Sequence, residues 1–301
     1  MPATVLNSRA KLPVDLASMS QQYKISYRDI LSTNPKTEKS KVQTYILHLA
    51  PDNTSGVNVC PGAGNCRKIC LHFAGNPVYM TNKQAARIRR TLAYAADKQR
   101  FARLIVCAIL SKLNKHSGEP TAIRLNGTSD IAWENVDFTV DAEFATFCRV
   151  KFGYFLPIGK RNIFEIFNNI EANYGAKVKF YDYTKIKRNW AECARLGYHL
   201  TCSFDGFNNA ANLKICQDAL QAGVNVAAAF NVKKGKNLPD YVNAAPFYPD
   251  AKDGQVLAVY DGDLSDFRPA DPSYGTIIGL RFKLPHGIKY SEADKQAFCI
   301  A

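Results

Sequence analysis

Short apolar runs alternate along this chain with longer amphipathic stretches. The short runs are rich in β-branched and aromatic residues, which pack well on a pleated sheet and therefore predict strands. Strands are predicted over residues 41–51, 121–127, 177–185, 198–206, 224–232, 256–263 and 276–283.

The amphipathic stretches predict helices, because their apolar residues recur every three or four positions. In residues 81–115 this spacing predicts one long helix or two consecutive ones; the positions that show it are Ala85, Ile88, Leu92 and Ala95. Further helices, each ending at a glycine, are predicted over 163–175, 189–197 and 209–223. Residues 131–160 favour neither type of element.

Strands that alternate with helices indicate a parallel sheet with helical crossovers. Seven strands are too few for a closed eight-stranded barrel, so the pattern favours an α/β fold built as a partial (β/α) barrel of TIM-like type. An open doubly wound sheet is the alternative. We expect residues 41–283 to form the barrel, 1–40 an N-terminal extension and 284–301 a C-terminal tail. Neither end carries a functional motif.

The composition is that of an ordinary globular protein, with 47% hydrophobic and 22% charged residues. No apolar run is long enough to cross a bilayer, and no secretory signal is found at the N-terminus. We therefore expect a cytoplasmic protein with no membrane partner. In that reducing compartment the nine cysteines are not expected to form disulfides.

Three cysteines lie close together in the sequence VCPGAGNCRKICLHFAG, within a loop at 58–75 that follows the first predicted strand. Thiolates bind zinc and iron–sulfur clusters. The loop contains a proline and two glycines, which let the backbone bend around a metal. We predict that Cys60, Cys66 and Cys70 are metal ligands. The remaining six cysteines are scattered and are expected to be small buried residues.

Three thiolates allow two kinds of metal site. A [4Fe–4S] cluster can use three cysteines and leave its fourth iron open to a small molecule. A structural zinc site needs four protein ligands, and His72 could then be the fourth. Unligated thiols are the third interpretation.

The formal net charge of +13 indicates an anionic partner, such as nucleic acid or a nucleotide substrate. Two functions from different classes therefore stay open: an iron–sulfur enzyme, and a zinc- or cluster-stabilised protein that binds nucleic acid without catalysis. In the second case the contacts would come from basic residues of 81–115, namely Arg87, Arg89, Arg90, Lys98, Arg100 and Arg103.

The cysteine loop resembles that of radical S-adenosylmethionine (radical SAM) enzymes. Those enzymes have a partial (β/α) barrel with three cysteines after the first strand, usually spaced Cys-x3-Cys-x2-Cys. The spacing here is Cys-x5-Cys-x3-Cys, a variant of that pattern.

A closer resemblance is to the bacteriophage gene-product-88 family of radical-SAM-like proteins. It is carried by CPGAGNCRKIC with the following FAGN, and by RLNGTSD, FYDYTK, VYDGDLSDFRPADP and IIGLRFK. The resemblance implies a phage enzyme in the host cytoplasm, with a [4Fe–4S] cluster and S-adenosylmethionine as cofactors.

The same resemblance implies residue roles at the carboxyl ends of the strands. Asp130, Lys185 and Asp205 would be catalytic. The cofactor-binding residues would be Asn126, Tyr183, Thr184, Ser203 and Asn231.

The segment VYDGDLSDFRPADP carries four aspartates, and alternating carboxylates can bind Ca²⁺ or Mg²⁺. The EF-hand pattern with its closing glutamate is not found. We favour a loop in which Asp261, Asp263, Asp266 and Asp271 form turns and pair with Arg268.

Overall fold

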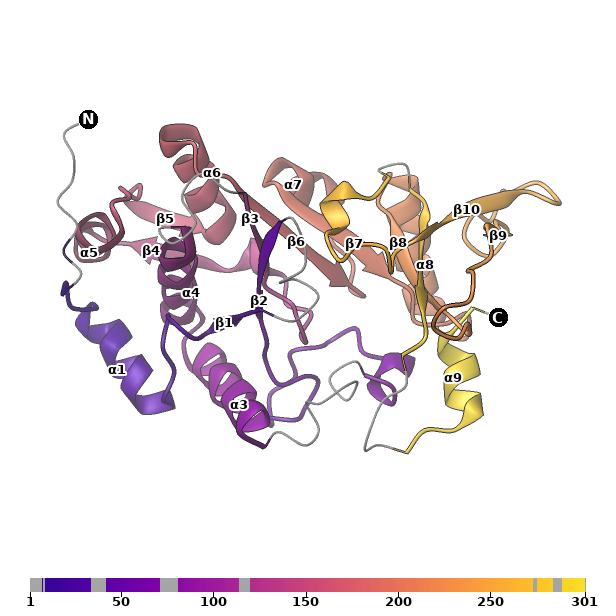
Figure 1. Ribbon diagram of the computed structural model, residues 1–301, viewed down its shortest axis with the longest axis horizontal. Helices are drawn as coiled ribbons and strands as arrows, with labels where there is room; N and C mark the ends of the chain where they lie inside the picture. The colour runs from indigo at the N-terminus through magenta and orange to yellow at the C-terminus, as the bar shows by residue number, and fades with distance from the viewer. Residues whose placement is uncertain are drawn as a thin grey trace.

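The computed structural model describes residues 7, 9–33, 42–70, 81–113, 120–272, 275–283 and 289–300. These residues form a mixed α/β structure around one large, mostly parallel sheet (Figure 1). Seven strands run parallel: β2 Gln43–Leu47, β3 Thr121–Arg124, β6 Val178–Thr184, β7 Tyr198–Ser203, β8 Val226–Phe230, β10 Val256–Asp261 and β11 Ile277–Arg281. Each lies within one of the seven predicted runs.

The sheet order is β1-β2-β3-β6-β7-β8-β11-β10-β9. The first five parallel strands follow chain order, whereas β11 inserts between β8 and β10. Two short antiparallel strands form the edges, β1 Leu31–Ser32 beside β2 and β9 Tyr241–Asn243 beside β10. Within the described residues these two edges do not pair with each other, so the sheet is open.

Helices connect most of the parallel strands and bury their apolar residues against the sheet. Their bounds are α3 Thr81–Ala96, α4 Lys98–Leu113, α5 Ala142–Phe152, α6 Ile163–Tyr174, α7 Trp190–Arg195 and α8 Ala210–Gln221. The predicted region 81–115 thus forms two helices. Helix α4 is the most deeply buried of these, with an unbroken buried run over 101–110.

An aromatic cluster shows how helix and sheet fit together. Phe164 of α6 stacks on Tyr198 of β7 at 4.4 Å between ring centroids, and it meets Phe180 of β6 edge-on at 4.9 Å. Offset and edge-on contacts are the favourable geometries for aromatic rings. Helix α6 begins with a capping box between Asn162 and Glu165, which fixes its start against the sheet.

Three regions contain more structure than the sequence pattern indicated. Residues 131–160 contain the turn η4 Trp133–Asn135, strand β4 Asp137–Val140, helix α5 and the start of strand β5 Gly159–Asn162, which pairs antiparallel with β4. The N-terminal region contains helix α1 Val14–Tyr23. Near the other end lies helix α9 Glu292–Phe298. None of the described helices is long and apolar enough to cross a membrane.

Candidate functional site

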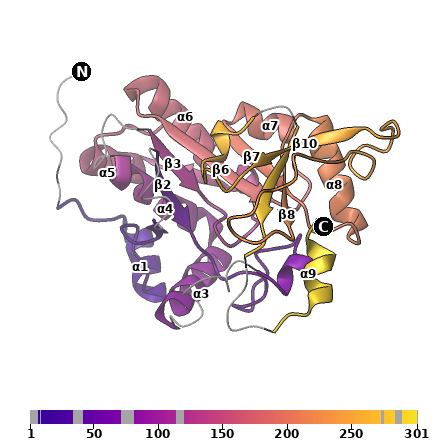
Figure 2. The same ribbon diagram turned by 45° about the vertical axis from the view of Figure 1, so that its right-hand side comes forward.

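The cysteine loop leaves the carboxyl end of β2 and crosses the ends of the neighbouring parallel strands (Figure 2). Cys60, Cys66 and Cys70 are all partly buried. Cys66 lies in a single helical turn, η1 Asn65–Arg67. Because parallel strands end at one edge of a sheet, the loop shares that edge with the residues that follow β3, β6 and β7.

Asp205, after the end of β7, holds the loop. Its Oδ2 accepts the backbone N–H of Asn65 at 2.7 Å, and its Oδ1 accepts that of Cys66 at 2.9 Å. Asp205 is fully buried, and its own N–H donates to Asn212 Oδ1 at 2.8 Å. A Cβ at Gly64 would overlap Asp205 Oδ2, so only glycine allows the loop this close to the carboxylate.

Lys185 faces the same carboxylate from the end of β6. Its Nζ donates to Ser203 Oγ at 2.5 Å and lies 3.9 Å from Asp205 Oδ1. Only 13% of the Lys185 side chain is exposed, so the ammonium is largely shielded from water. Lys185, Ser203 and Asp205 are all predicted site residues, and the structure brings the three together.

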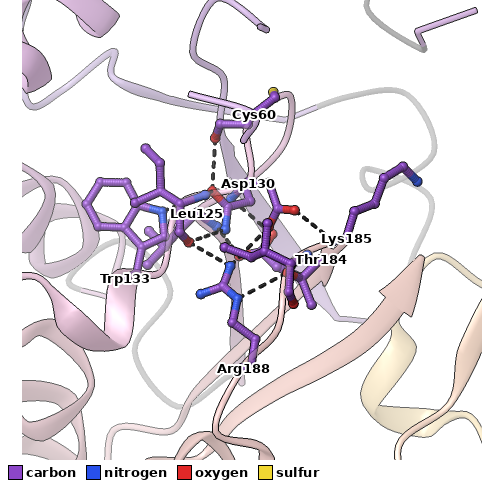
Figure 3. A network of polar contacts seen from close by, with 12 residues as sticks. Cys60, Leu125, Asp130, Trp133, Thr184, Lys185 and Arg188 are labelled. Atoms are coloured by element: carbon purple, nitrogen blue, oxygen red, sulfur yellow. Dashed lines mark hydrogen bonds and ion pairs between the residues drawn. The ribbon is translucent and has the colours of Figure 1, made fainter. Parts of the chain in front are cut away.

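Asp130 is bound from two sides (Figure 3). Its Oδ2 accepts the backbone N–H of Lys185 at 2.7 Å, and its Oδ1 accepts Arg188 Nη2 at 3.0 Å. Its own N–H donates to the carbonyl of Val59, next to Cys60. Asp130 therefore joins the cysteine loop to the end of β6, a positioning role.

Arg188 is the centre of a buried ionic network that also contains Asp130. Its Nη1 donates to both carboxylate oxygens of Glu134, at 2.8 and 2.9 Å, and its Nε donates to Thr184 Oγ1 at 3.1 Å. Only 1% of the Arg188 side chain is exposed. Hydrogen bonds between a guanidinium and a carboxylate are stronger than neutral ones, because both groups are charged. The Thr184 hydroxyl is thus part of this network, because it accepts the hydrogen bond from Arg188.

Asn126, after β3, is a buried hydrogen-bonding centre. Its Oδ1 accepts Ser129 Oγ and Ile131 N–H at 2.9 Å and Trp133 Nε1 at 3.2 Å. Its backbone N–H donates to Asp182. With 4% of the residue exposed, Asn126 shapes the loop after β3.

Burial raises the pKa of Asp182 to about 6, with Arg124 and the hydrogen bonds from Leu125, Asn126 and Tyr198 opposing that rise. Asp182 is fully buried beneath the loop after β3. Its carboxylate accepts the backbone N–H of Leu125 at 2.9 Å and of Asn126 at 3.0 Å.

The other two proposed cofactor-binding residues, Tyr183 and Asn231, make different contacts. The Tyr183 ring lies under the Arg124 guanidinium, 5.2 Å from its carbon to the ring centroid. Asn231 is exposed, and its backbone N–H donates to the carbonyl of Ile300 at 3.0 Å.

Electrostatic interactions join the three cysteine thiols. Burial raises the pKa of Cys60 to about 11 and that of Cys66 to about 12, and Cys70 acts on both of these thiols. Lys185 opposes the rise at Cys66, and Cys70 in turn interacts with the buried guanidinium of Arg87. Without metal the thiols of Cys60 and Cys66 are therefore protonated at neutral pH, and metal binding would release those protons.

The chemistry of this donor set fits a thiolate-bound metal: three neighbouring thiols on a bent loop, with cations on two sides. Among the residues that the structure describes, however, no three His, Cys, Asp or Glu side chains lie close enough to hold a metal ion as they stand. Ligation would require the thiols to move together. His72, the predicted fourth ligand for zinc, lies outside the described residues.

Three of the four aspartates of residues 261–271 pair with arginines. Asp271 forms a buried ion pair with Arg268 at 3.0 Å, as expected. Asp261 and Asp263 instead pair with Arg281 of β11, at 2.8 and 3.2 Å. The turn η5 Arg268–Ala270 packs on β6 and β7.

Most of the basic side chains proposed for nucleic-acid binding interact within the protein. Arg90 donates to the carbonyl of Asp29 at 2.8 Å, and Arg103 donates to Asp15 at 2.9 Å. Arg100 pairs with Asp97 at 3.2 Å. The remaining engaged cations are Lys98, which lies over the Tyr94 ring, and Arg87, which is buried.

Three residues of the site were not predicted from the sequence. Arg188 stands in the basic run KIKRN, which looks like an exposed turn. Asn212 lies within a helical pattern, and only the fold shows that it supports Asp205. Phe298 is far away in the sequence, yet its ring lies 5.6 Å from Lys185 Nζ.

The fold and this site define an α/β protein with a cysteine loop seated across the carboxyl edge of an open, mostly parallel sheet. The sequence model of one family, gene product 88, matches residues 28–301. Since this match covers most of the chain, the protein belongs to the gene product 88 family. No curated protein and no solved structure matches it.

Proposed function

We propose that this protein is an iron–sulfur enzyme of radical-SAM-like chemistry, with its parallel strands arranged as a partial (β/α) barrel. Cys60, Cys66 and Cys70 would hold a [4Fe–4S] cluster, with S-adenosylmethionine as co-substrate. The observation that supports this most is that the Asp205 carboxylate accepts hydrogen bonds from the backbone N–H groups of Asn65 and Cys66 in the loop. It keeps Cys66 beside Lys185 at the strand ends, where enzymes with parallel α/β sheets place their sites.

A cluster held by these cysteines, once reduced by an external electron donor, would supply one electron for cleavage of a carbon–sulfur bond of a sulfonium co-substrate. The products would be a thioether and a carbon radical that abstracts hydrogen from the substrate. The chain's own residues position the reactants. Lys185 offers a compact cation to a carboxylate or phosphate of a bound molecule. Asp130 fixes the backbone of Lys185, and Asp205 fixes the backbone of Cys66.

The charge balance supports an anionic substrate, which we propose is a nucleotide. The net charge of +13 attracts phosphates. A long nucleic acid would instead need a continuous free basic surface. Most basic side chains of α3 and α4 considered for that role are already held by carboxylates, carbonyls or aromatic rings.

Anaerobic purification followed by iron and sulfide quantification tests the cluster. We expect both elements and absorbance near about 400 nm, which is typical of thiolate-bound iron. Substitution of Cys60, Cys66 and Cys70 by alanine should abolish all three signals. The matched control replaces Cys107, Cys148 and Cys193, which removes the same number of thiols from buried positions and should retain the iron.

Three results would count against the proposal. Zinc without sulfide would indicate a structural metal site. A colourless protein without metal after anaerobic reconstitution would remove the cluster altogether. Full iron content in the loop triple variant would refute these ligands. If the cluster is present, release of methionine from S-adenosylmethionine under a chemical reductant tests the co-substrate separately.

A further inference from the structure

Helix α9 lies on the cysteine loop, although its sequence carries no functional motif. It packs against η1, the turn that contains Cys66 (Figures 1 and 2). The carbonyl of Ala297 accepts Asn65 Nδ2 at 3.2 Å, and Asp294 pairs with Lys68 at 2.7 Å. Both contacts therefore reach residues within two positions of Cys66.

The backbone of α9 also touches the loop that follows β7. Gly206 has a φ of +99°, and a Cβ there would overlap the carbonyl of Ala297. Only glycine combines this backbone conformation with such a close approach. Gly206 directly follows Asp205, so α9 contacts both the cysteine loop and the segment that holds it.

The residues after α9 fix the helix to the sheet. Ile300 N–H donates to the carbonyl of Ala229 at 2.8 Å, and Asn231 N–H donates to the carbonyl of Ile300 at 3.0 Å. These bonds form a parallel bridge beside the end of β8. Cys299 and Ile300 are buried. The described end of the chain is thus part of the sheet's carboxyl edge.

Phe298, the last residue of α9, completes the surroundings of Lys185. Its ring centroid lies 5.6 Å from Lys185 Nζ, which also contacts Ser203 and Asp205. An ammonium over an aromatic face is attracted by the ring's charge distribution, more strongly where water is excluded. The ring therefore limits where the Lys185 ammonium can lie.

We propose that α9 is a structural part of the site: Phe298 is a positioning residue for Lys185, and the helix shields the Cys66 thiol. This inference rests on the proposed function only in treating the strand ends as the active site. The shielding itself needs no bound metal.

Alkylation of the metal-free, reduced protein by N-ethylmaleimide at neutral pH tests the inference, with each cysteine followed by mass spectrometry. In Phe298→Ala we expect Cys66 to react at least about fivefold faster, because local opening becomes easier. Cys107, buried in α4, should react as slowly as in the wild type. Tyr174→Ala, which removes another partly exposed aromatic ring at a helix end, should leave Cys66 unchanged.

An unchanged Cys66 rate in folded Phe298→Ala would overturn the inference. If Cys107 also becomes reactive, Asp294→Ala decides, since it loosens α9 locally by removing the contact to Lys68 and the capping box with Ser291 at the start of the helix. Faster alkylation of Cys66 alone in that variant supports the inference, and an unchanged rate overturns it. Because no iron is present, this result and the metal analysis can fail independently.

Discussion

Asp205 binds the backbone N–H of Cys66 through Oδ1 at 2.9 Å, across two loops that are far apart in the sequence. The neighbouring N–H of Asn65 binds Oδ2 of the same carboxylate at 2.7 Å. Hydrogen bonds to a charged acceptor are stronger than neutral ones. This one side chain therefore sets where the cysteine loop lies relative to the sheet.

Replacing Asp205 with asparagine should loosen the loop. The amide keeps one acceptor but turns its NH₂ group toward a backbone donor, so we expect a loss of about 2–4 kcal/mol of stability. Hydrogen exchange at the amides of Asn65 and Cys66 should accelerate, and reconstituted iron content should fall. The control is Asp218→Asn, which alters a surface pair with Lys214 on α8. Slow exchange at Cys66 in Asp205→Asn would contradict the role given to the carboxylate.

Arg188→Met should be strongly destabilising. It leaves the Asp130 and Glu134 carboxylates without their buried cation, a change that costs about 3–5 kcal/mol. Denaturant unfolding measures the loss. Combining it with Asp130→Asn and Glu134→Gln should restore much of the stability, because no uncompensated charge remains.

The control for this network is Arg195→Met, which disrupts an exposed pair with Glu192 and should leave the unfolding midpoint unchanged. If Arg188→Met proves as mild as this surface change, the network is not the anchor described here.

Asn126→Ala should lower stability by about 2–4 kcal/mol, because it leaves several buried donors and acceptors without partners. Thermal and denaturant unfolding should agree on the loss. The loop after β3 should also become accessible to proteases. Asn173→Ala, at an exposed position of α6, is the comparison and should have little effect. Wild-type stability in Asn126→Ala would show that the loop is held by other contacts.

The Asp271 carboxyl predicts a specific pH dependence. Burial raises its pKa from 3.8 to about 6, with Arg268 opposing. Between those values the folded protein binds the proton more tightly than the unfolded chain does. This group's contribution to stability is therefore present at low pH and is lost as the pH rises through about 6.

Unfolding free energies of wild type and Asp271→Asn, measured from pH 4.5 to 7, test this dependence. The advantage of wild type over the variant should fall by about 1–3 kcal/mol as the pH rises. Asp261→Asn should show no such change in this range, because Arg281 lowers the pKa of Asp261 below 3.8 and the contribution of Asp261 is lost only as the pH falls below that value. A constant difference between wild type and Asp271→Asn would refute the raised pKa.

The central sheet could be predicted because its strands are apolar runs bounded by turns, a pattern that depends only on local sequence. The edge strands β1 and β9 span two and three residues, too short to show any pattern. The antiparallel pair of β4 and β5 could not be predicted for a related reason: β5 is the polar sequence GKRN. Its partner supplies the apolar residues, so the pairing depends on tertiary contacts.

The candidate site could be predicted in part for similar reasons. Lys185, Ser203 and Asp205 follow strand ends, and parallel topology brings strand ends together. The sequence does not show which of these polar residues face the candidate site and which hold a loop in place, because that depends on hydrogen-bond partners elsewhere in the chain. Asp130 reads as a site residue in the sequence, yet both of its oxygens bind Lys185 and Arg188. Metal binding by the three cysteines stays a prediction.

The position of β11 affects how the protein can fold during synthesis. This strand pairs with β8 through five residue pairs, but it leaves the ribosome after β10, which lies outside it in the sheet. Until residue 281 has emerged, the nascent chain exposes an unpaired edge of β8, which is open to wrong partners. Strand β10 pairs with β11 and not with β8, so it cannot join the sheet until β11 has paired with β8. This half of the sheet must therefore assemble late.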